Sequence, residues 1–349
     1  IGVVGSQFGI DDLRTGFNRA KLAWYNIDPI FYTRQRPSEI SDNEISKNET
    51  RRIFIEEIFP QQDIVQGQSR IQNTFDLSFF PNEKGPYNNN LNQDFLNNSK
   101  SNWAGITRDL SSTNFEKANV EFIQFWLLDT FSDNDSNLNN LGNLVLNLGN
   151  ISEDILKDGK KLYENGLPIV NSQEIVNESN WGKTPATQSL IYSFDSDENN
   201  RVLQDLGYDG LNDIQEIDKY NNGSSNDPAG DNYQYYIDAN GGILNRYKNY
   251  NGTQGNSPIN VGNTGRGSTT VPDNEDVNQD NTMNTIDSYF EYNVPITKNM
   301  RVGNHPFISD VRNDVKVDLP NGNSITTRWI QFKIPVSSQF YKSRRYSSF

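Results

Sequence analysis

The chain of 349 residues has no cysteine and a single histidine. The absence of cysteine excludes disulfide bonds, thiolate nucleophiles and cysteine-ligated zinc sites. The histidine, His305, precedes Pro306 in a sequence typical of a turn, which favours a loop histidine over a general base. The sequence also lacks the nucleophile-elbow, phosphate-loop and dinucleotide-binding patterns in a strand-to-helix context. We therefore expect a protein that is not an enzyme, and the alternative left open is a glycan-active enzyme with a pair of carboxylates among its 45 acidic residues.

Basic residues are scarce. The chain has 31 Lys and Arg against 45 Asp and Glu, for a net charge of -14, and only "YKSRRY" near the end is a basic cluster. Nucleic acid is not an expected partner, because phosphate neutralisation needs a basic face. No apolar run reaches the roughly 18–20 residues of a membrane helix. The first residues include neither Met nor the basic region of a signal peptide, so we expect an internal piece of a longer protein.

The apolar residues that are present mostly alternate with polar ones, which is typical of strands. "NTFDLSFF" places Phe75, Leu77 and Phe79 on one face and predicts a half-buried strand. "VEFIQFWLLD", residues 120–129, is apolar on both faces and predicts a strand in the middle of a sandwich. Its expected sheet partners are "NLVLNLGN" and "RWIQFKIPV", which point Leu144, Leu146 and Leu148, and Ile330, Phe332, Ile334 and Val336, to one side.

Two short helices are expected between strands. One begins at Ser152 and stops at Gly159, and the other begins at Thr184 and Pro185. Runs rich in Asn, Asp and Gly predict long loops. The predicted fold is mainly β: a jelly-roll-like β-sandwich with short helices. We expect a strand-rich N-terminal segment at residues 1–100 and a sandwich domain at 101–349, with a calcium-loop insertion at about 195–300.

"DVNQDNTMNTID", residues 276–287, has oxygen-bearing residues at the ligand positions of a calcium loop. The predicted ligands are Asp276, Asn278, Asp280, the carbonyl of Thr282, and Asp287, with Asn284 at position 9. The spacing is closer to dockerin-type loops than to full EF-hands, because position 6 is Asn281 and position 12 is Asp287. Asn281 can adopt the left-handed backbone that glycine usually supplies. Asp287 reaches less far than glutamate, which predicts a weak site.

"DLGYDGLNDIQE", residues 205–216, gives a second match. Asp205, Asp209, Asp213 and Glu216 occupy positions 1, 5, 9 and 12, and Gly210 occupies position 6. Gly207, at position 3, offers no ligand side chain. A single match of this kind can arise by chance in a loop rich in Asn and Asp. Two matches in one insertion predict at least one bound, structural Ca²⁺.

Two tryptophans, Trp103 and Trp181, are expected at loop edges. Exposed rings beside paired carboxylates are typical of carbohydrate recognition, whereas rings that plug the end of a sandwich are part of the core. The alternative function to be weighed is therefore a calcium-stabilised carbohydrate-binding module or a surface adhesin.

Several longer blocks occur in a recognisable order. They are "NWAGITRDLSSTNFEKANVEFIQFWLLDTF", "LGNISEDILKDGKKLYENGLP", "DLGYDGLND", "DPAGDNYQYY", "NEDVNQDNTMNTIDSYFEY" and "WIQFKIPV". Together they resemble the SprA/Sov family of the Bacteroidetes. Members of that family are giant outer-membrane β-barrels that form the translocon of the type nine secretion system and, in gliding species, are linked to gliding motility.

The resemblance implies that this chain is part of such a translocon. It implies as partners a PorV-type outer-membrane barrel protein, a periplasmic plug protein and exported proteins with C-terminal signal domains. Membrane strands would alternate over about 10 residues with short turns, which most of this sequence does not do. We therefore expect an insertion that shapes or caps the pore at the cell outer membrane, on the extracellular side, with the periplasmic side as the alternative.

Overall fold

The computed structural model describes residues 11–92, 94–112, 115, 117–131, 142–161, 164, 167, 175–186, 193–220, 225–257, 269, 271–298, 300–336 and 344–345. The described strands are β1 (Ala20–Tyr25), β2 (Asp76–Lys84), β3 (Phe122–Leu128), β4 (Gly142–Asn150), β5 (Val176–Glu178), β6 (Lys183–Pro185), β7 (Ser288–Ile296), β8 (Ile308–Asp318), β9 (Ser324–Pro335) and β10 (Arg344–Arg345). The helices are α1 (Ile55–Ile58), α2 (Asp94–Asn97), α3 (Glu198–Val202), α4 (Asp213–Tyr220) and α5 (Ile243–Arg246), with 3-10 turns η2 (Leu13–Gly16), η3 (Pro29–Tyr32) and η4 (Glu44–Ser46).

The strands form antiparallel sheets, which confirms the mainly β prediction. The sheet orders are β3-β9-β8, β10-β7-β4, β1-β2 and β5-β6. The more specific expectation of a jelly roll stays a prediction. Among the described residues, no helix has the length and apolar composition needed to cross a membrane.

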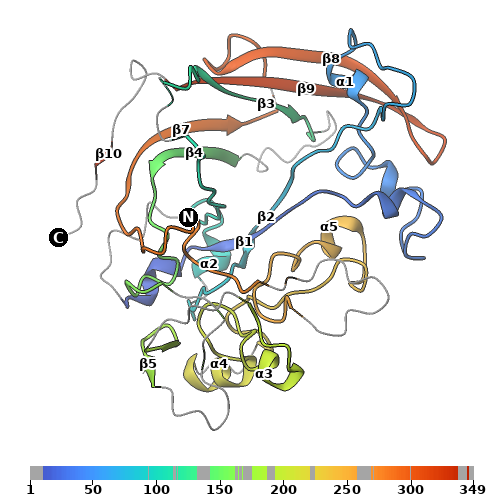
Figure 1. The fold of residues 1–349 in the computed structure, drawn as a ribbon. Coiled ribbons are helices and arrows are strands. Elements are labelled where there is room, and N and C mark those ends of the chain that lie inside the picture. Colours follow the sequence, from blue (N-terminus) through green and yellow to red (C-terminus); the bar gives the residue numbers. More distant parts are fainter. Residues whose placement is uncertain are drawn as a thin grey trace.

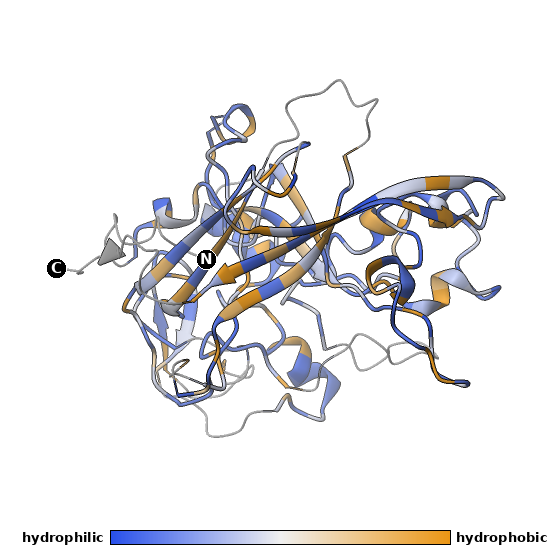
Figure 2. Ribbon diagram, turned by 90° about the horizontal axis from the view of Figure 1, so that it is seen from above, coloured by the Kyte–Doolittle hydropathy of each residue, from blue (hydrophilic) through white to orange (hydrophobic). Residues whose placement is uncertain are grey.

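The first two of these sheets pack face to face as a small sandwich, with β3, β9 and β8 above β7 and β4 (Figure 1). Apolar and polar residues alternate along the long strands (Figure 2), so one face of each sheet turns inward. The core contains the fully buried Ile330, Phe332 and Ile334, as predicted, together with Tyr292, Val294, Met300 and Ile308. Leu144, Leu146 and Leu148 pack against it from β4. Each such burial stabilises the fold by about 1.5–3 kcal/mol.

Strand β3 is apolar on both faces, as expected, but it lies at the edge of its sheet, and β9 is central. Its inner face contributes Ile123, Phe125 and Leu127 to the sandwich core. Its outer face places Trp126 and Leu128 against a second cluster of Ile53, Ile58 and Trp329. The segment around α1 covers this outer face, so an edge strand can be partly buried on both of its faces.

The β1-β2 ribbon corrects the expectation for "NTFDLSFF". Phe75, Leu77 and Phe79 do lie on one face, but that face is 60%, 46% and 45% exposed at these residues. The opposite face packs on a tyrosine-rich cluster, in which the Tyr25 ring stacks on Tyr247 with 4.0 Å between ring centroids. Ala23 and Ser78 on that face leave room for large rings from residues 233–250, and Phe80 packs against the same cluster, so Leu77 and Phe79 are turned outward.

The expected helix at residues 152–159 is wrong. The backbone there is an irregular loop, because acidic side chains bind the amides that would otherwise begin a helix. Glu275 Oε1 accepts from Ile155 N and Leu156 N, and Asp154 accepts from Asp158 N and Gly159 N. Thr184 and Pro185 lie in β6 rather than at a helix start. Residues 187–192, where that helix was expected to continue, lie outside the described residues.

Candidate metal centre

A tight turn followed by α4 positions the first acidic side chains of the site. Gly207 and Gly210 have backbone φ of +73° and +65°, values that glycine adopts without strain. Asn212 then caps α4 in a reciprocal box: its side chain accepts from Gln215 N, and the Gln215 side chain accepts from Asn212 N. Asp209 therefore precedes the helix, and Glu216 lies in its first turns.

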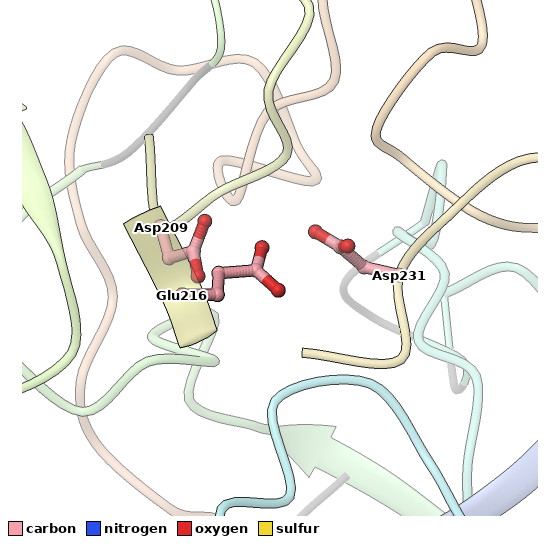
Figure 3. Close-up of side chains that lie close together, drawn as sticks. All are labelled: Asp209, Glu216 and Asp231. Atoms are coloured by element: carbon pink, nitrogen blue, oxygen red, sulfur yellow. The ribbon is translucent and has the colours of Figure 1, made fainter. Parts of the chain in front are cut away.

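Three carboxylates converge in this region (Figure 3). Asp209 and Glu216 come from the turn and from α4, and Asp231 faces them from the following loop. One oxygen from each lies within 4.8 Å of the other two. The three residues are 1%, 0% and 1% exposed. Their negative charges are therefore gathered in an interior from which water is largely excluded.

Each carboxylate has one oxygen held by the protein and one left over. Asp209 Oδ1 accepts from Leu211 N at 3.1 Å, and Glu216 Oε2 accepts from Ala229 N at 2.9 Å. Asp231 Oδ2 lies 3.5 Å from Thr253 Oγ1, at the limit of a hydrogen bond. The other oxygens, Asp209 Oδ2, Glu216 Oε1 and Asp231 Oδ1, are buried and have no hydrogen-bond partner among the described residues.

Buried polar atoms in folded proteins are normally satisfied, and an unpaired buried charge costs several kcal/mol. A cation shared by the three carboxylates would satisfy these unpartnered oxygens, so the group is a candidate metal site. The backbone contacts to the opposite oxygens orient the carboxylates before an ion arrives, as the outer contacts of metal ligands do.

The electrostatics agree with this interpretation. Burial, followed by repulsion from neighbouring carboxylates, raises the pKa of Asp209 and Asp231 well above the usual aspartate range. Burial also raises the pKa of Glu216 to about 7. The metal-free site therefore favours bound protons, and a divalent cation would take their place.

A second acidic group adjoins the first. One oxygen each from Asp213, Glu216 and Asp227 also lies within 4.8 Å of the others. Asp213 and Asp227 are half-buried, and Asn232 Nδ2 donates to both oxygens of Asp213, at 3.1 and 3.2 Å. Glu216 therefore belongs to both groups.

The structure brings Glu216 together with Asp209 in one group and with Asp213 in the other, but it places Asp205 elsewhere. The Asp205 carboxylate accepts from Gly255 N at 3.0 Å and from Ser257 N at 2.9 Å. Asp227 and Asp231 are absent from the predicted ligand set, although both lie in "DPAGDN", a short run with two aspartates after α4. Because a linear 12-residue pattern ends at Glu216, it cannot reach them.

The loop at residues 276–287 has the expected backbone, with Asn281 at φ +66°. Its oxygens serve other contacts. Asp276 is buried, accepts from Asp280 N and Asn281 N, and lies 3.4 Å from Lys161 Nζ. Asn278 Oδ1 accepts from Asp280 N and Asp287 Oδ1 accepts from Ser152 N, while Asp280 Oδ1 accepts from Thr282 N and Oγ1. Calcium binding by this loop stays a prediction.

Comparison with known protein families gives a match over the same region. The SprA_N family, described as a motility related/secretion protein, matches residues 208–344. No curated protein matches the chain. The matched residues run from the turn before Asp209, through the acidic groups, to β7, β8, β9 and the start of β10. Residues 208–344 are thus similar to the SprA_N family of motility related/secretion proteins, which supports the resemblance to the SprA/Sov family.

Proposed function

We propose that this chain is a non-catalytic domain of a type nine secretion translocon, linked to gliding motility, and that it shapes or caps the outer-membrane pore. The observation that carries the proposal is the extent of the family match. It covers both the buried acidic site and the strands β7, β8 and β9 of the sandwich. The match to a secretion family thus includes a β-sandwich scaffold and its acidic site, which supports a structural role.

Calcium is the cation we propose for the acidic site. The candidate ligands are all carboxylate oxygens, with no histidine or cysteine among them, and hard cations prefer such ligands. Mg²⁺ usually keeps several waters, whereas Ca²⁺ tolerates six to eight oxygens at about 2.3–2.6 Å. On the extracellular side, where calcium is abundant, even a modest site would be filled.

The bound ion would brace the insertion against the N-terminal ribbon. Ala229 N donates to Glu216, and Ala229 O accepts from Tyr87 N at 2.6 Å. The Tyr87 hydroxyl in turn accepts from Tyr208 N at 2.7 Å. Fixing Glu216 and Asp231 therefore fixes the contact between residues 205–232 and the segment that follows β2.

The β1-β2 ribbon supports the proposed link to the rest of the parent protein. Trp24 pairs with Leu77 and Leu22 with Phe79, so apolar side chains of both strands share a face. Exposed apolar faces of this kind mark contact surfaces. We propose that residues 1–100 connect here to barrel strands. The PorV-type protein, the plug protein and exported proteins are the proposed partners of the whole translocon.

The carbohydrate-binding alternative needs exposed tryptophans. Trp181 is 1% exposed, in a cluster with Tyr87, Leu156 and Ala229. Trp103 is half-buried, and the guanidinium carbon of Arg19 lies 5.7 Å from its ring centroid. Trp181 has no free face for a sugar to stack on, and the Trp103 ring is half-buried beside Arg19, which favours the translocon proposal.

The experiment is a secretion assay in cells that produce the parent protein with Asp209→Asn and Asp231→Asn together. We expect lower export of cargo at an equal surface amount of the parent protein. Asp63→Asn, an exposed acid far from the site in sequence, is the matched control. Normal export by the double variant would contradict the proposal that this domain, stabilised by its acidic site, shapes or caps the pore.

A further inference from the structure

The two acidic groups share only Glu216. The inner group adds Asp209 and Asp231, which are fully buried, and the outer group adds Asp213 and Asp227, which are half-buried. Glu216 Oε1 is buried and has no hydrogen-bond partner among the described residues. A carboxylate with one unused oxygen between two pairs of acids is placed to serve both pairs.

The geometry of calcium sets how many acids one ion can hold. With ligand distances of about 2.3–2.6 Å, two oxygens on one Ca²⁺ lie at most about 5 Å apart. Each group of three fits this limit, because its oxygens lie within 4.8 Å of one another. The five acids do not form one such group but two. One ion can therefore satisfy either group but not both.

From this we propose that the five carboxylates bind two calcium ions that share Glu216. The inner ion is held by Asp209, Glu216 and Asp231, and the outer ion by Asp213, Glu216 and Asp227. This inference rests on the proposed calcium role and deepens it.

The surrounding contacts favour two occupied positions. Asp231 N donates to Asp227 Oδ1 at 3.1 Å, so the loop that presents an inner ligand also orients an outer one. Asn232 Nδ2 likewise orients Asp213. The short stretch of backbone from Asp227 to Asn232 therefore contacts ligands of both the outer and the inner group.

The charge count also favours two ions. With one divalent ion, the five carboxylates keep three negative charges. A second ion leaves one, near the half-buried Lys21, whose Nζ donates to Gly230 O at 2.9 Å. Burial lowers the pKa of Lys21, and the charges of Asp227 and Asp231 oppose that shift. Lys219 also faces Asp209, but its Nζ donates to Ser179 O and its side chain is largely solvated.

The two ions should differ in affinity. The outer acids are half-buried, so their ion keeps water ligands and exchanges with solvent. The inner acids are buried and present three orphan oxygens. We expect the outer ion to leave first when free calcium is lowered.

The test is the number of calcium ions bound per chain, counted by native mass spectrometry at a fixed free Ca²⁺ concentration. Glu216→Gln should lose two ions relative to the unaltered chain, and Asp227→Asn should lose one. Asp280→Asn is the control for the loop at residues 276–287, because any ion bound there should be lost in this variant alone. Because Asp227 is half-buried and Asn is isosteric, its variant reports on binding even if the Glu216 variant folds poorly.

The possible results separate the proposals. Loss of a single ion in Glu216→Gln, or of none in Asp227→Asn, overturns the second ion but leaves a single calcium brace intact. Loss of two ions in Asp227→Asn overturns the separate ligand sets, because the inner ion would then also depend on an outer acid. If none of the variants loses an ion, both the two-ion inference and the proposed calcium role are overturned.

Discussion

Gly207 faces the carboxylate of Asp231 so closely that a Cβ at residue 207 would lie 2.1 Å from Asp231 Oδ2. Gly207 stands at the one position of "DLGYDGLNDIQE" where a ligand side chain was missing. The structure supplies the reason: Asp231 enters from the next loop and occupies the space that a side chain at residue 207 would need.

Gly207→Ala should therefore weaken calcium binding at least tenfold, because the methyl group displaces Asp231. Calorimetric titration with Ca²⁺ measures this. Gly255→Ala is the matched control, since Gly255 also has positive φ, +75°, but no atom within 4 Å of its Cβ position. Both variants should lose about 1–3 kcal/mol of stability from backbone strain. Equal calcium affinity in the two variants would refute the steric explanation.

Removing one inner carboxylate should affect stability in opposite directions with and without metal. Asp231→Asn should lower Tm by several degrees in calcium, because a ligand is lost. In metal-free buffer it should raise Tm or leave it unchanged, because repulsion with Asp209 and Glu216 is relieved. Thermal unfolding of both forms gives the comparison. A fall of the same size under both conditions would mean that Asp231 is structural only.

The pH dependence of stability should differ between the two forms. Burial raises the folded pKa of Asp209, Asp231 and Glu216 above the unfolded values, that of Glu216 to about 7. Relative to the unfolded chain, these acids stabilise the metal-free fold fully below about pH 4, and that contribution is lost as pH rises through the folded pKa values. Tm of the metal-free chain should therefore fall towards pH 8.

Calcium replaces those protons, so the gain in Tm on adding calcium should grow with pH. Other buried acids, such as Glu164 and Asp273, titrate in both forms and largely cancel from this difference. A calcium-dependent gain that is constant from pH 5 to pH 8 would show that the three acids are not its source.

The two faces of the sheets should respond differently to truncation. Ile330→Ala removes a fully buried side chain from the sandwich core and should cost about 2–5 kcal/mol. Phe79→Ala removes a larger side chain from the exposed face of β2 and should cost less than about 1 kcal/mol. Urea unfolding measures both. A large loss for Phe79→Ala would mean that this face is covered in the free chain.

The strands of the sandwich were predictable because alternation reports which side chains share a face. Leu144, Leu146 and Leu148 on β4 and Ile330, Phe332 and Ile334 on β9 all reach the core. Alternation does not report which face meets a neighbour. Phe79 and its companions on β2 were expected inside, but the tyrosine cluster around Tyr247 packs on the other face.

The acidic site was predictable only in part, for a similar reason. A linear loop pattern includes Asp209, Asp213 and Glu216, which the structure places in the two acidic groups because α4 and its preceding turn are local. Asp227 and Asp231 arrive through the return of the chain after α4, which no spacing within residues 205–216 encodes. The helix predicted at 152–159 is absent for a similar reason. Glu275, which accepts from the backbone amides of this segment, lies more than a hundred residues away in the sequence.

Long-wavelength anomalous diffraction from crystals of the chain grown in calcium tests the central claim most directly. The account predicts a calcium peak between Asp209, Glu216 and Asp231, at about 2.3–2.6 Å from one oxygen of each. A site that contains only water, or carboxylates turned away from one another in the presence of calcium, would contradict it.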